Sequence, residues 1–436
     1  MSLIACVFPA PPLSRPFNGG RRAGRTVPGS PVNRESTGEL ADGILHMAPA
    51  TTRLSGVDAA RGLALFGMMA IHVLPEAGED FQPTLTWLLF AGKAAALFAL
   101  LAGVTLAFTT RTARSERGSL LSAARWAVAA RAGLIMALGL AIAYVDMPAF
   151  IILAYYGAMF LLAVPFLGVS TRTLLIAAAG FAVLGPILMQ LLRGSLPEPG
   201  FDPTFTTALT EPGVFVSQLL LTGTYPAIPW MAYICVGLAV GRLPLGQTAV
   251  QLKLLGAGLL LAVGTWLGSV LLLDGPGQGF NRLVATDPDL FAEEIRDVMV
   301  WGPEEYLPTS SGWWLAVVSP HTTTPFDLLH TIGVALAVVS AMLLLARYAG
   351  WVLLVLSAPG RMTLTLYCTH LLFLGTGALA DLPYLSFWLQ VPAFIIFAVL
   401  WQRAGKQGPL EQLVSRGSGA VREAVLRRHP DPQPER

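Results

Sequence analysis

Long apolar runs recur along the chain and predict its architecture. A helix needs about 20 mostly apolar residues to cross the roughly 30 Å hydrocarbon layer of a bilayer. Ten runs of this kind cover residues 57–75, 84–108, 127–145, 149–168, 173–192, 226–241 (with an apolar lead-in from 214), 252–273, 326–346, 362–380 and 384–401. The pattern predicts an all-α polytopic membrane protein, a bundle of about ten transmembrane helices.

Basic and acidic residues alternate between these runs, which predicts the orientation. Arginine and lysine accumulate in the cytoplasmic connections of membrane proteins. After the second run they occur in every second connection and in the C-terminal segment, at Arg111, Arg114, Arg117, Arg125, Arg172, Arg242, Lys253, Arg347, Arg361, Arg403 and Lys406. The other connections carry Glu76, Glu79, Asp80, Asp146 and Asp381. Both termini are therefore expected in the cytoplasm, which agrees with an even number of spans.

The same pattern divides the chain into three parts. They are a Pro-, Gly- and Arg-rich tail expected to be disordered and cytoplasmic (1–52), a membrane domain (53–403) and a cytoplasmic C-terminal tail (404–436). The sequence leaves open whether translation begins at Met1 or Met47.

Two long connections, 194–213 and 274–325, are expected outside the cell. In the longer one, Asp287-Pro288 precedes an amphipathic pattern with apolar residues from Leu290 to Met299. Asp at the N-cap and Pro in the first turn are typical of a helix start. We expect this helix to lie on the membrane surface or to cover a cavity.

Composition supports a membrane protein and excludes some functions. Hydrophobic residues make up 54% of the chain and charged residues 12%, against about 25% charged in an ordinary globular protein. The formal net charge is only +2, so no nucleic-acid partner is expected. Cys6, Cys235 and Cys368 are too few and too scattered for a disulfide framework.

The first run, VDAARGLALFGMMAIHVL, contains the clearest polar set. Ionisable side chains inside a bilayer are costly and usually have a function. Arg61 and His72 are eleven residues apart, which places them within about 20° of one helix face and about 16 Å apart. A cation near the inner boundary would then share a face with an imidazole near the outer one. The alternative is that Asp58 and Arg61 form an anchoring pair and His72 is a core residue.

Two further groups lie in or beside apolar runs. Lys93, inside AGKAAALFALLAG, should face a cavity or a carboxylate. In PHTTTPFDLLHTIGVAL, His321 lies in the outer connection, while Asp327 and His330 are one helical turn apart. An aspartate that orients an imidazole is common in general-base sites. Alternatively, Asp327 caps the helix and His330 is an interhelical donor.

The ninth run, GRMTLTLYCTHLL, carries a polar stripe. Thr363, Tyr367 and His370 fall near one face, and they could hold helices together or form a pocket wall. Arg361 precedes them at the inner entrance, on the opposite side of the helix from His370. The motifs HExxH and CxxC are absent, so no metal site is expected.

Several of these motifs resemble the transmembrane acyltransferase superfamily. Arg61, ten residues and His72 in DAARGLALFGMMAIHV resemble the first-span pattern of the acyltransferase-3 proteins. KAAALFALLAGVTLA, ILAYYGAMFLLAVPFL, YPAIPWMAYICVGLAVGRL, PHTTTPFDLLHTIGVAL and GRMTLTLYCTHLL look most like YeiB-type proteins of unknown function and bacterial heparan-α-glucosaminide N-acetyltransferase-like proteins. The resemblance runs from about residue 53 to 403.

The resemblance implies a reaction. Acetyl-CoA or another acyl-CoA would enter from the cytoplasm and donate its acyl group to a hydroxyl or amine, expected on a glycan at the outer face. The implied donor-binding residues are Arg61, Asp58, Lys93 and Arg361, and the implied catalytic residues are His72, His330 and His370. The acceptor would contact His321, Asp327, Trp313, Trp314 and Tyr367, with Tyr306 as a further stacking residue.

A different class of function remains open at this stage. A transporter could use Lys93, His72 and Asp58 as a solute or proton path. In either case the expected location is the plasma membrane, with the lipid bilayer as partner. The sequence leaves open whether the protein forms a homodimer.

Overall fold

The structure is a computed structural model that describes residues 54–286, 290–304, 306–350 and 352–428. The predictions for the N-terminal tail, for Met47, for Cys6 and for Asp287-Pro288 lie outside these residues. Regular secondary structure in the described ranges is helical throughout; one isolated bridge joins Ala77 and Pro83.

Helices occupy all ten predicted positions. Seven of the described helices are long and apolar enough to cross a membrane, a pair bent by 48° would make an eighth, and two shorter apolar helices fall at the remaining positions. In chain order they are α2 (Ser55–Val73), α3 with α4 (Leu85–Phe90, Lys93–Thr109), α6 (Gly118–Ile142), α7 (Leu153–Ala163), α8 (Thr171–Leu192), α10 with α11 (Pro212–Ser217, Ala227–Val240), α12 (Thr248–Leu273), α15 (Pro325–Tyr348), α17 (Thr363–Leu374) and α18 (Pro383–Arg403). The predicted fold class is confirmed, and the cytoplasmic placement of the termini stays a prediction.

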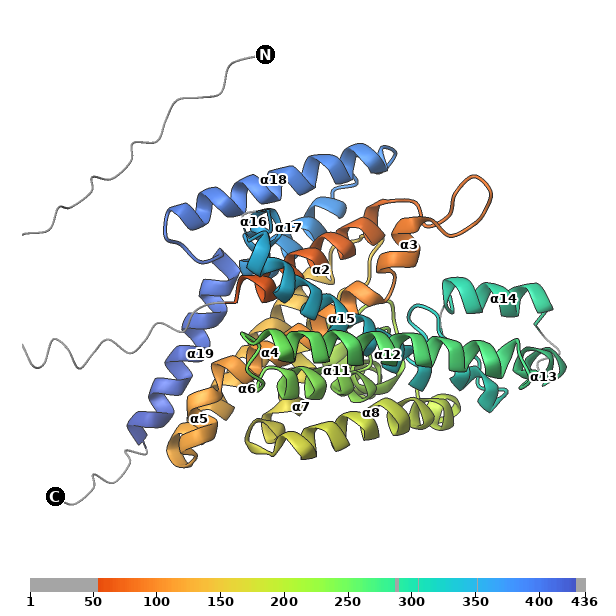
Figure 1. The fold of residues 1–436 in the computed structure, drawn as a ribbon, viewed down its shortest axis with the longest axis horizontal. Helices are drawn as coiled ribbons and strands as arrows, with labels where there is room; N and C mark the ends of the chain where they lie inside the picture. Colours follow the sequence, from red (N-terminus) through yellow and green to blue (C-terminus); the bar gives the residue numbers. More distant parts are fainter. Residues whose placement is uncertain (1–53, 287–289, 305, 351, 429–436) are drawn as a thin grey trace, which may run out of the picture. The chain divides into compact units, whose positions relative to one another are not determined.

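The peripheral helices expose apolar side chains that only a bilayer accommodates. Figure 1 shows α8 and α18 on opposite sides of the bundle. Leu184 on α8, Leu260 on α12 and Trp388 on α18 are 65%, 78% and 64% exposed. Exposed apolar area of this extent is rare on soluble monomers. These surfaces therefore face lipid.

Glycines bring helix backbones into contact at several crossings, and at two of them a glycine of one helix meets a glycine of the other. A Cβ at Gly103 of α4 or at Gly237 of α11 would overlap the backbone of the other helix. Gly258 of α12 and Gly333 of α15 meet in the same way. Small residues that allow close approach are typical of packing between membrane helices.

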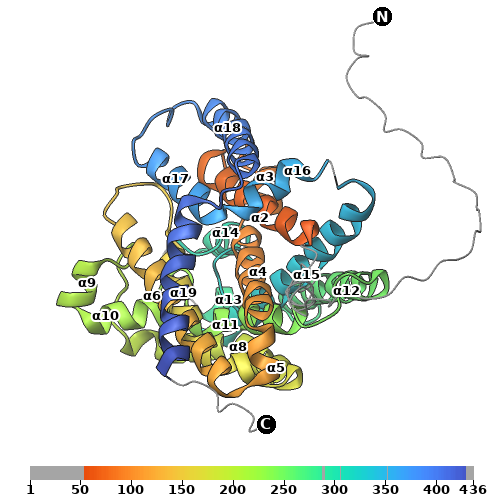
Figure 2. The same cartoon turned by 90° about the vertical axis from the view of Figure 1, so that its left-hand side faces the viewer.

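A helix also forms where only a C-terminal tail was expected. α19 (Pro409–Arg428) lies alongside α6 (Figures 1 and 2). Its residue Val414 is buried in the main core, although the helix as a whole is polar. α19 is too polar to give an apolar run, so the pattern of spans does not predict it.

The long connection that is expected outside the cell folds into a small unit with its own core, which we call the outer unit. It contains α13 (Gly279–Thr286) and α14 (Ala292–Trp301), and Ile295 and Trp314 are fully buried in its centre. The predicted amphipathic helix is therefore present. α14 begins at Ala292, with Phe291 at the N-cap and the Glu294 carboxylate accepting from the Phe291 N–H at 2.6 Å.

Candidate active site

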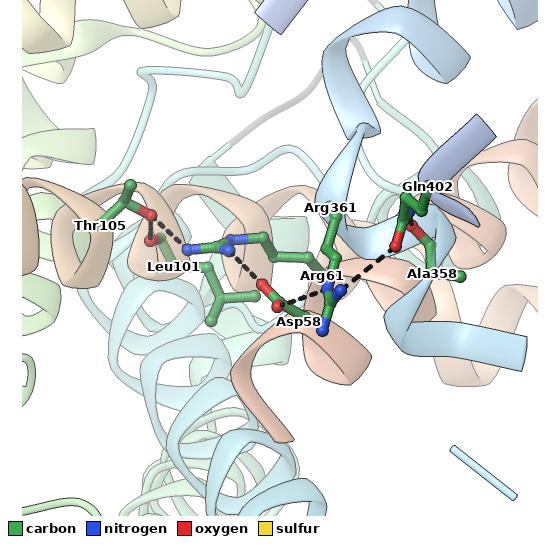
Figure 3. Close-up of polar contacts among 7 residues, drawn as sticks. All are labelled: Asp58, Arg61, Leu101, Thr105, Ala358, Arg361 and Gln402. Carbon is green, nitrogen blue, oxygen red and sulfur yellow. Dashed lines mark hydrogen bonds and ion pairs between the residues drawn. The ribbon is translucent and has the colours of Figure 1, made fainter. Parts of the chain in front are cut away.

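One buried carboxylate holds two arginines at the start of α2. Asp58, whose side chain is 3% exposed, accepts from Arg61 Nη1 at 2.7 Å and from Arg361 Nε at 3.3 Å (Figure 3). Arg61 Nη2 also donates to Thr105 Oγ1 of α4 at 2.6 Å. Arg361 lies in the short turn η5 (Pro359–Arg361), before α17 begins. Both guanidinium groups are therefore fixed in place.

Glycine allows this arrangement. The turn η5 crosses α2 so closely that a Cβ at Gly360 would overlap the backbone oxygen of Asp58. A Cβ at Gly62 would overlap the backbone of Leu356 in the same way. Arg361 therefore reaches Asp58 because two glycines let the backbones touch.

A cavity of about 250 Å³ adjoins these arginines; we call it the inner cavity. Arg61, Arg131 and Arg361 line it together with Glu411 of α19. The remaining wall is mainly apolar and aromatic, formed by Met68, Phe98, Leu101, Ala102, Leu106, Ile135, Ile152, Leu153, Tyr156, Phe160 and Tyr367 among others. The cavity thus combines cationic groups with an apolar wall.

Glu411 joins α19 to the first turn of α17. Its carboxylate accepts from the backbone N–H of Leu364 at 2.7 Å and of Thr365 at 3.1 Å, and from Thr365 Oγ1 at 2.5 Å. The first N–H groups of a helix have no partner within the helix. A side chain from another helix therefore caps α17, which carries Tyr367 and His370.

Two histidines meet beyond the inner cavity. His72 Nδ1 and His370 Nε2 are 3.2 Å apart, and the two rings meet edge to edge, with centroids 5.4 Å apart and planes 8° from parallel. The His72 ring also lies 6.5 Å, centroid to centroid, from the ring of Tyr367, which lines the inner cavity. His370 is fully buried. Arg61 and His72 of α2 thus both face the region of α17.

A second cavity of about 120 Å³, the outer cavity, lies among the loops that precede α11 and α15. His321, Arg193, Thr222 and Tyr306 line it. Three of them have buried polar atoms without a hydrogen-bond partner among the described residues: Nε and Nη1 of Arg193, Oγ1 of Thr222 and Nδ1 of His321. Such atoms are costly unless a ligand or water satisfies them.

His321, which lines the outer cavity, lies within electrostatic range of His72, and its ring centroid is 5.7 Å from that of Tyr225. Burial lowers the pKa of His321 to about 4, so the ring is neutral at physiological pH. Its backbone has φ +61°, and that of Thr323 has φ +50°. Such strained residues persist where the surrounding structure enforces them, often at functional sites.

Asp327 and His330 do not form the predicted pair. His330 Nδ1 lies 3.0 Å from the backbone oxygen of Ala262 in α12, while Asp327 interacts electrostatically with Lys93 of α4. Thr324, not Asp327, caps α15 by accepting from the Asp327 N–H at 3.0 Å. The reason is geometric, since residues three apart differ by about 60° around a helix and here face different neighbours.

The two predicted tryptophans do not line the outer cavity. Trp314 is fully buried in the core of the outer unit and donates from Nε1 to Ser310. Trp313 packs beside that core, with the Arg282 guanidinium 5.2 Å from its ring centroid. Both stabilise the outer unit, whereas Tyr306 and His321 from the same connection do reach the cavity.

Sequence reasoning missed three polar residues near the site. Arg131 lies within the third predicted span and could have been found by the argument applied to Lys93. Gln390, in the apolar segment SFWLQVPAF, lies 2.8 Å from His370 through Oε1. Nothing in the sequence indicated a role for Glu411 at the site, because a glutamate in a polar segment is common. Among the described residues, no group of three or more His, Cys, Asp or Glu side chains could hold a metal ion.

Comparison with known families adds to this geometry. The model of a family of unknown function, DUF418, matches residues 303–418. The model of the heparan-alpha-glucosaminide N-acetyltransferase catalytic domain matches residues 53–273, just over half of the chain. No curated protein matches the sequence. Arg61 and His72 lie in one matched segment and Arg361 and His370 in the other, so the site is built from both. The resemblance seen in the motifs is confirmed, and the chain belongs to the family of the heparan-alpha-glucosaminide N-acetyltransferase catalytic domain.

Proposed function

We propose that the protein is a membrane acyltransferase that moves an acetyl group from cytoplasmic acetyl-CoA to a hydroxyl or amine at the outer face. One observation carries the proposal. The His72–His370 pair is next to Tyr367, which lines the arginine-bearing inner cavity, and within range of His321, which lines the outer cavity. Family membership supports acetyl transfer as the reaction class.

The inner cavity has the chemistry that an acyl-CoA requires. Arg61, Arg131 and Arg361 would bind its phosphates, because guanidinium groups make strong charge-assisted hydrogen bonds to phosphate oxygens. The apolar wall would cover the pantetheine arm. Along α2 the rise from Arg61 to His72 is about 16 Å, a distance of the order of that arm. The thioester would then lie near His72.

The reaction follows from this placement. The acceptor oxygen or nitrogen attacks the thioester carbonyl carbon, a new C–O or C–N bond forms, and the C–S bond breaks. His72 takes the proton that the acceptor loses and returns it to the departing CoA thiolate. The products are the acetylated acceptor and CoA. A positioned base of this kind contributes about 10²–10⁴-fold to the rate.

The outer cavity would hold the acceptor. The unpartnered atoms of Arg193, Thr222 and His321 offer both donors and acceptors. A polyhydroxylated molecule such as a glycan would satisfy them. The Arg193 guanidinium already lies over the Tyr306 ring, 3.9 Å from its centroid, so these two side chains would form one wall of the acceptor site.

Donor binding and acyl transfer can be tested in purified protein reconstituted in nanodiscs. Arg61→Ala should weaken binding of radiolabelled acetyl-CoA about 10–100-fold, the effect of losing one charged hydrogen bond of about 1.5–3 kcal/mol. Arg172→Ala, at an exposed arginine on α8, is the matched control and should bind as the wild type does.

His72→Ala should still bind acetyl-CoA, but should lose transfer by about 10²–10⁴-fold. Transfer is measured as CoA thiol release in the presence of mixed sugars and amino sugars. Equal binding and equal thiol release in the wild type and both variants would defeat the proposal. Sugar uptake into proteoliposomes without thiol release would favour the transporter alternative instead.

A further inference from the structure

Behind His370, a chain of polar side chains continues into α18. His370 Nδ1 lies 2.8 Å from Gln390 Oε1, and Gln390 Nε2 donates to Ser386 Oγ at 3.1 Å and to the Ser386 backbone oxygen at 3.3 Å. Gln390 and Ser386 are 5% and 3% exposed. A glutamine and a serine buried in an apolar helix require a reason, because each must satisfy its hydrogen bonds inside the protein.

We propose that Gln390 and Ser386 are positioning residues that act through His370 to hold His72 in one tautomer, with the proton on Nδ1 and Nε2 free as the base. The inference rests on the proposed function for the role of His72. The tautomers themselves are determined by the hydrogen-bond contacts alone.

The surroundings of Gln390 fix the orientation of its side-chain amide. Its nitrogen donates and cannot accept, and it faces the Ser386 backbone oxygen, which can only accept. Turning the amide over would place two acceptor oxygens against each other. The amide oxygen therefore points to His370 and must receive a hydrogen, so His370 Nδ1 carries the proton.

His370 in turn determines which nitrogen of His72 carries the proton. A fully buried imidazole with no carboxylate bonded to it among the described residues is neutral, and a neutral ring protonated at Nδ1 has a bare Nε2. That Nε2 is 3.2 Å from His72 Nδ1. His72 Nδ1 must then be the donor, and the neutral form of His72 therefore has no proton on Nε2.

The consequence for the reaction is a base with its lone pair on a defined atom. When the acceptor attacks the thioester, its proton moves to His72 Nε2, and the resulting imidazolium keeps donating from Nδ1 to His370 Nε2. The proton then passes from Nε2 to the CoA thiolate. Gln390 exchanges no proton and only orients the chain, as outer-shell partners of functional histidines commonly do.

The tautomer can be read directly by ¹⁵N NMR of histidine-labelled protein in nanodiscs, because protonated and bare imidazole nitrogens differ widely in chemical shift. The His72 signals are those lost in His72→Ala. In the wild type we expect a protonated Nδ1 and a bare Nε2 on His72. A protonated Nε2 would overturn the proposal, and this measurement needs no variant of Gln390.

Gln390→Met keeps the side-chain length and removes the amide. It should release His72 into a mixture of tautomers and lower kcat about 10-fold or more, with the KM for acetyl-CoA unchanged. Gln251→Met, at a buried glutamine of α12 that bonds to Leu245 and Arg347, is the matched control and should leave the His72 tautomer unchanged.

The positioning role of Gln390 and the proposed function of the enzyme can be refuted independently of each other. An unchanged tautomer in Gln390→Met would refute the positioning role even if the enzyme transfers acetyl groups. If NMR showed the expected tautomers but His72→Ala still transferred acetyl groups at the full rate, His72 would not be the base. The hydrogen-bond chain would then have only a structural role.

Discussion

Replacing Glu411 with alanine tests whether the C-terminal helix supports the site. The Glu411 carboxylate is the only acceptor that α19 offers to the first turn of α17 in the described contacts, where it receives two backbone N–H groups and the Thr365 hydroxyl. Without it, the N–H groups of Leu364 and Thr365 lose their partner. The first turn of α17 should loosen, and Tyr367 and His370 are carried by the turns that follow.

The magnitude follows from these contacts. Hydrogen bonds to a charged group contribute about 1.5–3 kcal/mol, and loss of a helix cap costs about 0.5–2 kcal/mol. The three bonds share one carboxylate, so they do not add fully, and Glu411 is partly exposed, so water replaces part of the loss. We expect Glu411→Ala to lower the free energy of unfolding by about 2–3 kcal/mol. Glu411→Gln keeps an oxygen for the two N–H groups and should cost about 1 kcal/mol.

Equilibrium unfolding in SDS mixed micelles, followed by circular dichroism, measures this difference. The control is Glu423→Ala on the same helix. Glu423 is 73% exposed and its only described ion pair is with Arg427 at 3.7 Å, and exposed pairs contribute about 0–1 kcal/mol. If Glu411→Ala unfolded at the same SDS fraction as Glu423→Ala, the capping role inferred for Glu411 would be wrong.

Three further predictions address packing, pH and orientation. Gly360→Ala should destabilise by about 1–3 kcal/mol in the same titration, because its Cβ would overlap the backbone of α2, whereas Gly264→Ala meets no atom within 4 Å and should be neutral or stabilising. Burial raises the pKa of Asp202 from 3.8 to about 7, so its contribution to stability is complete below about pH 4 and is lost as the pH rises to about 7. In thermal unfolding, Asp202→Asn should reduce this decline, and an unchanged slope would contradict the assignment. In a cysteine-free background, an impermeant maleimide should label Phe81→Cys on intact cells and Leu413→Cys only after permeabilisation; the opposite pattern would reverse the predicted orientation.

The spans could be predicted because a helix that crosses the bilayer must be apolar over the full thickness of the hydrocarbon layer. A run of about 20 apolar residues has few alternatives to a crossing helix, and even the proline-interrupted run around Pro226 appears as a bent pair of helices. Boundaries shifted by several residues where helices end in turns. α17, for example, is helical only from Thr363 to Leu374, although the apolar run continues to residue 380.

The site could be predicted only where it depends on one helix. Helical periodicity places Arg61 and His72 on one face, since that relation is local. The contact of His72 with His370 joins residues 298 positions apart, and nothing in either local sequence specifies the other. The same limit explains the error at Asp327, since a spacing of three gives proximity along a helix but does not decide which neighbouring helix each side chain meets.

The glycine crossings restrict which parts of the protein can move. Backbone contact at Gly103 with Gly237, and at Gly258 with Gly333, leaves no side-chain layer that could slide or repack. Rocking of α4 against α11, or of α12 against α15, would break these contacts outright. Each of these two pairs should therefore move as one unit, and so should α17 and α19, which are joined to each other through the Glu411 side chain.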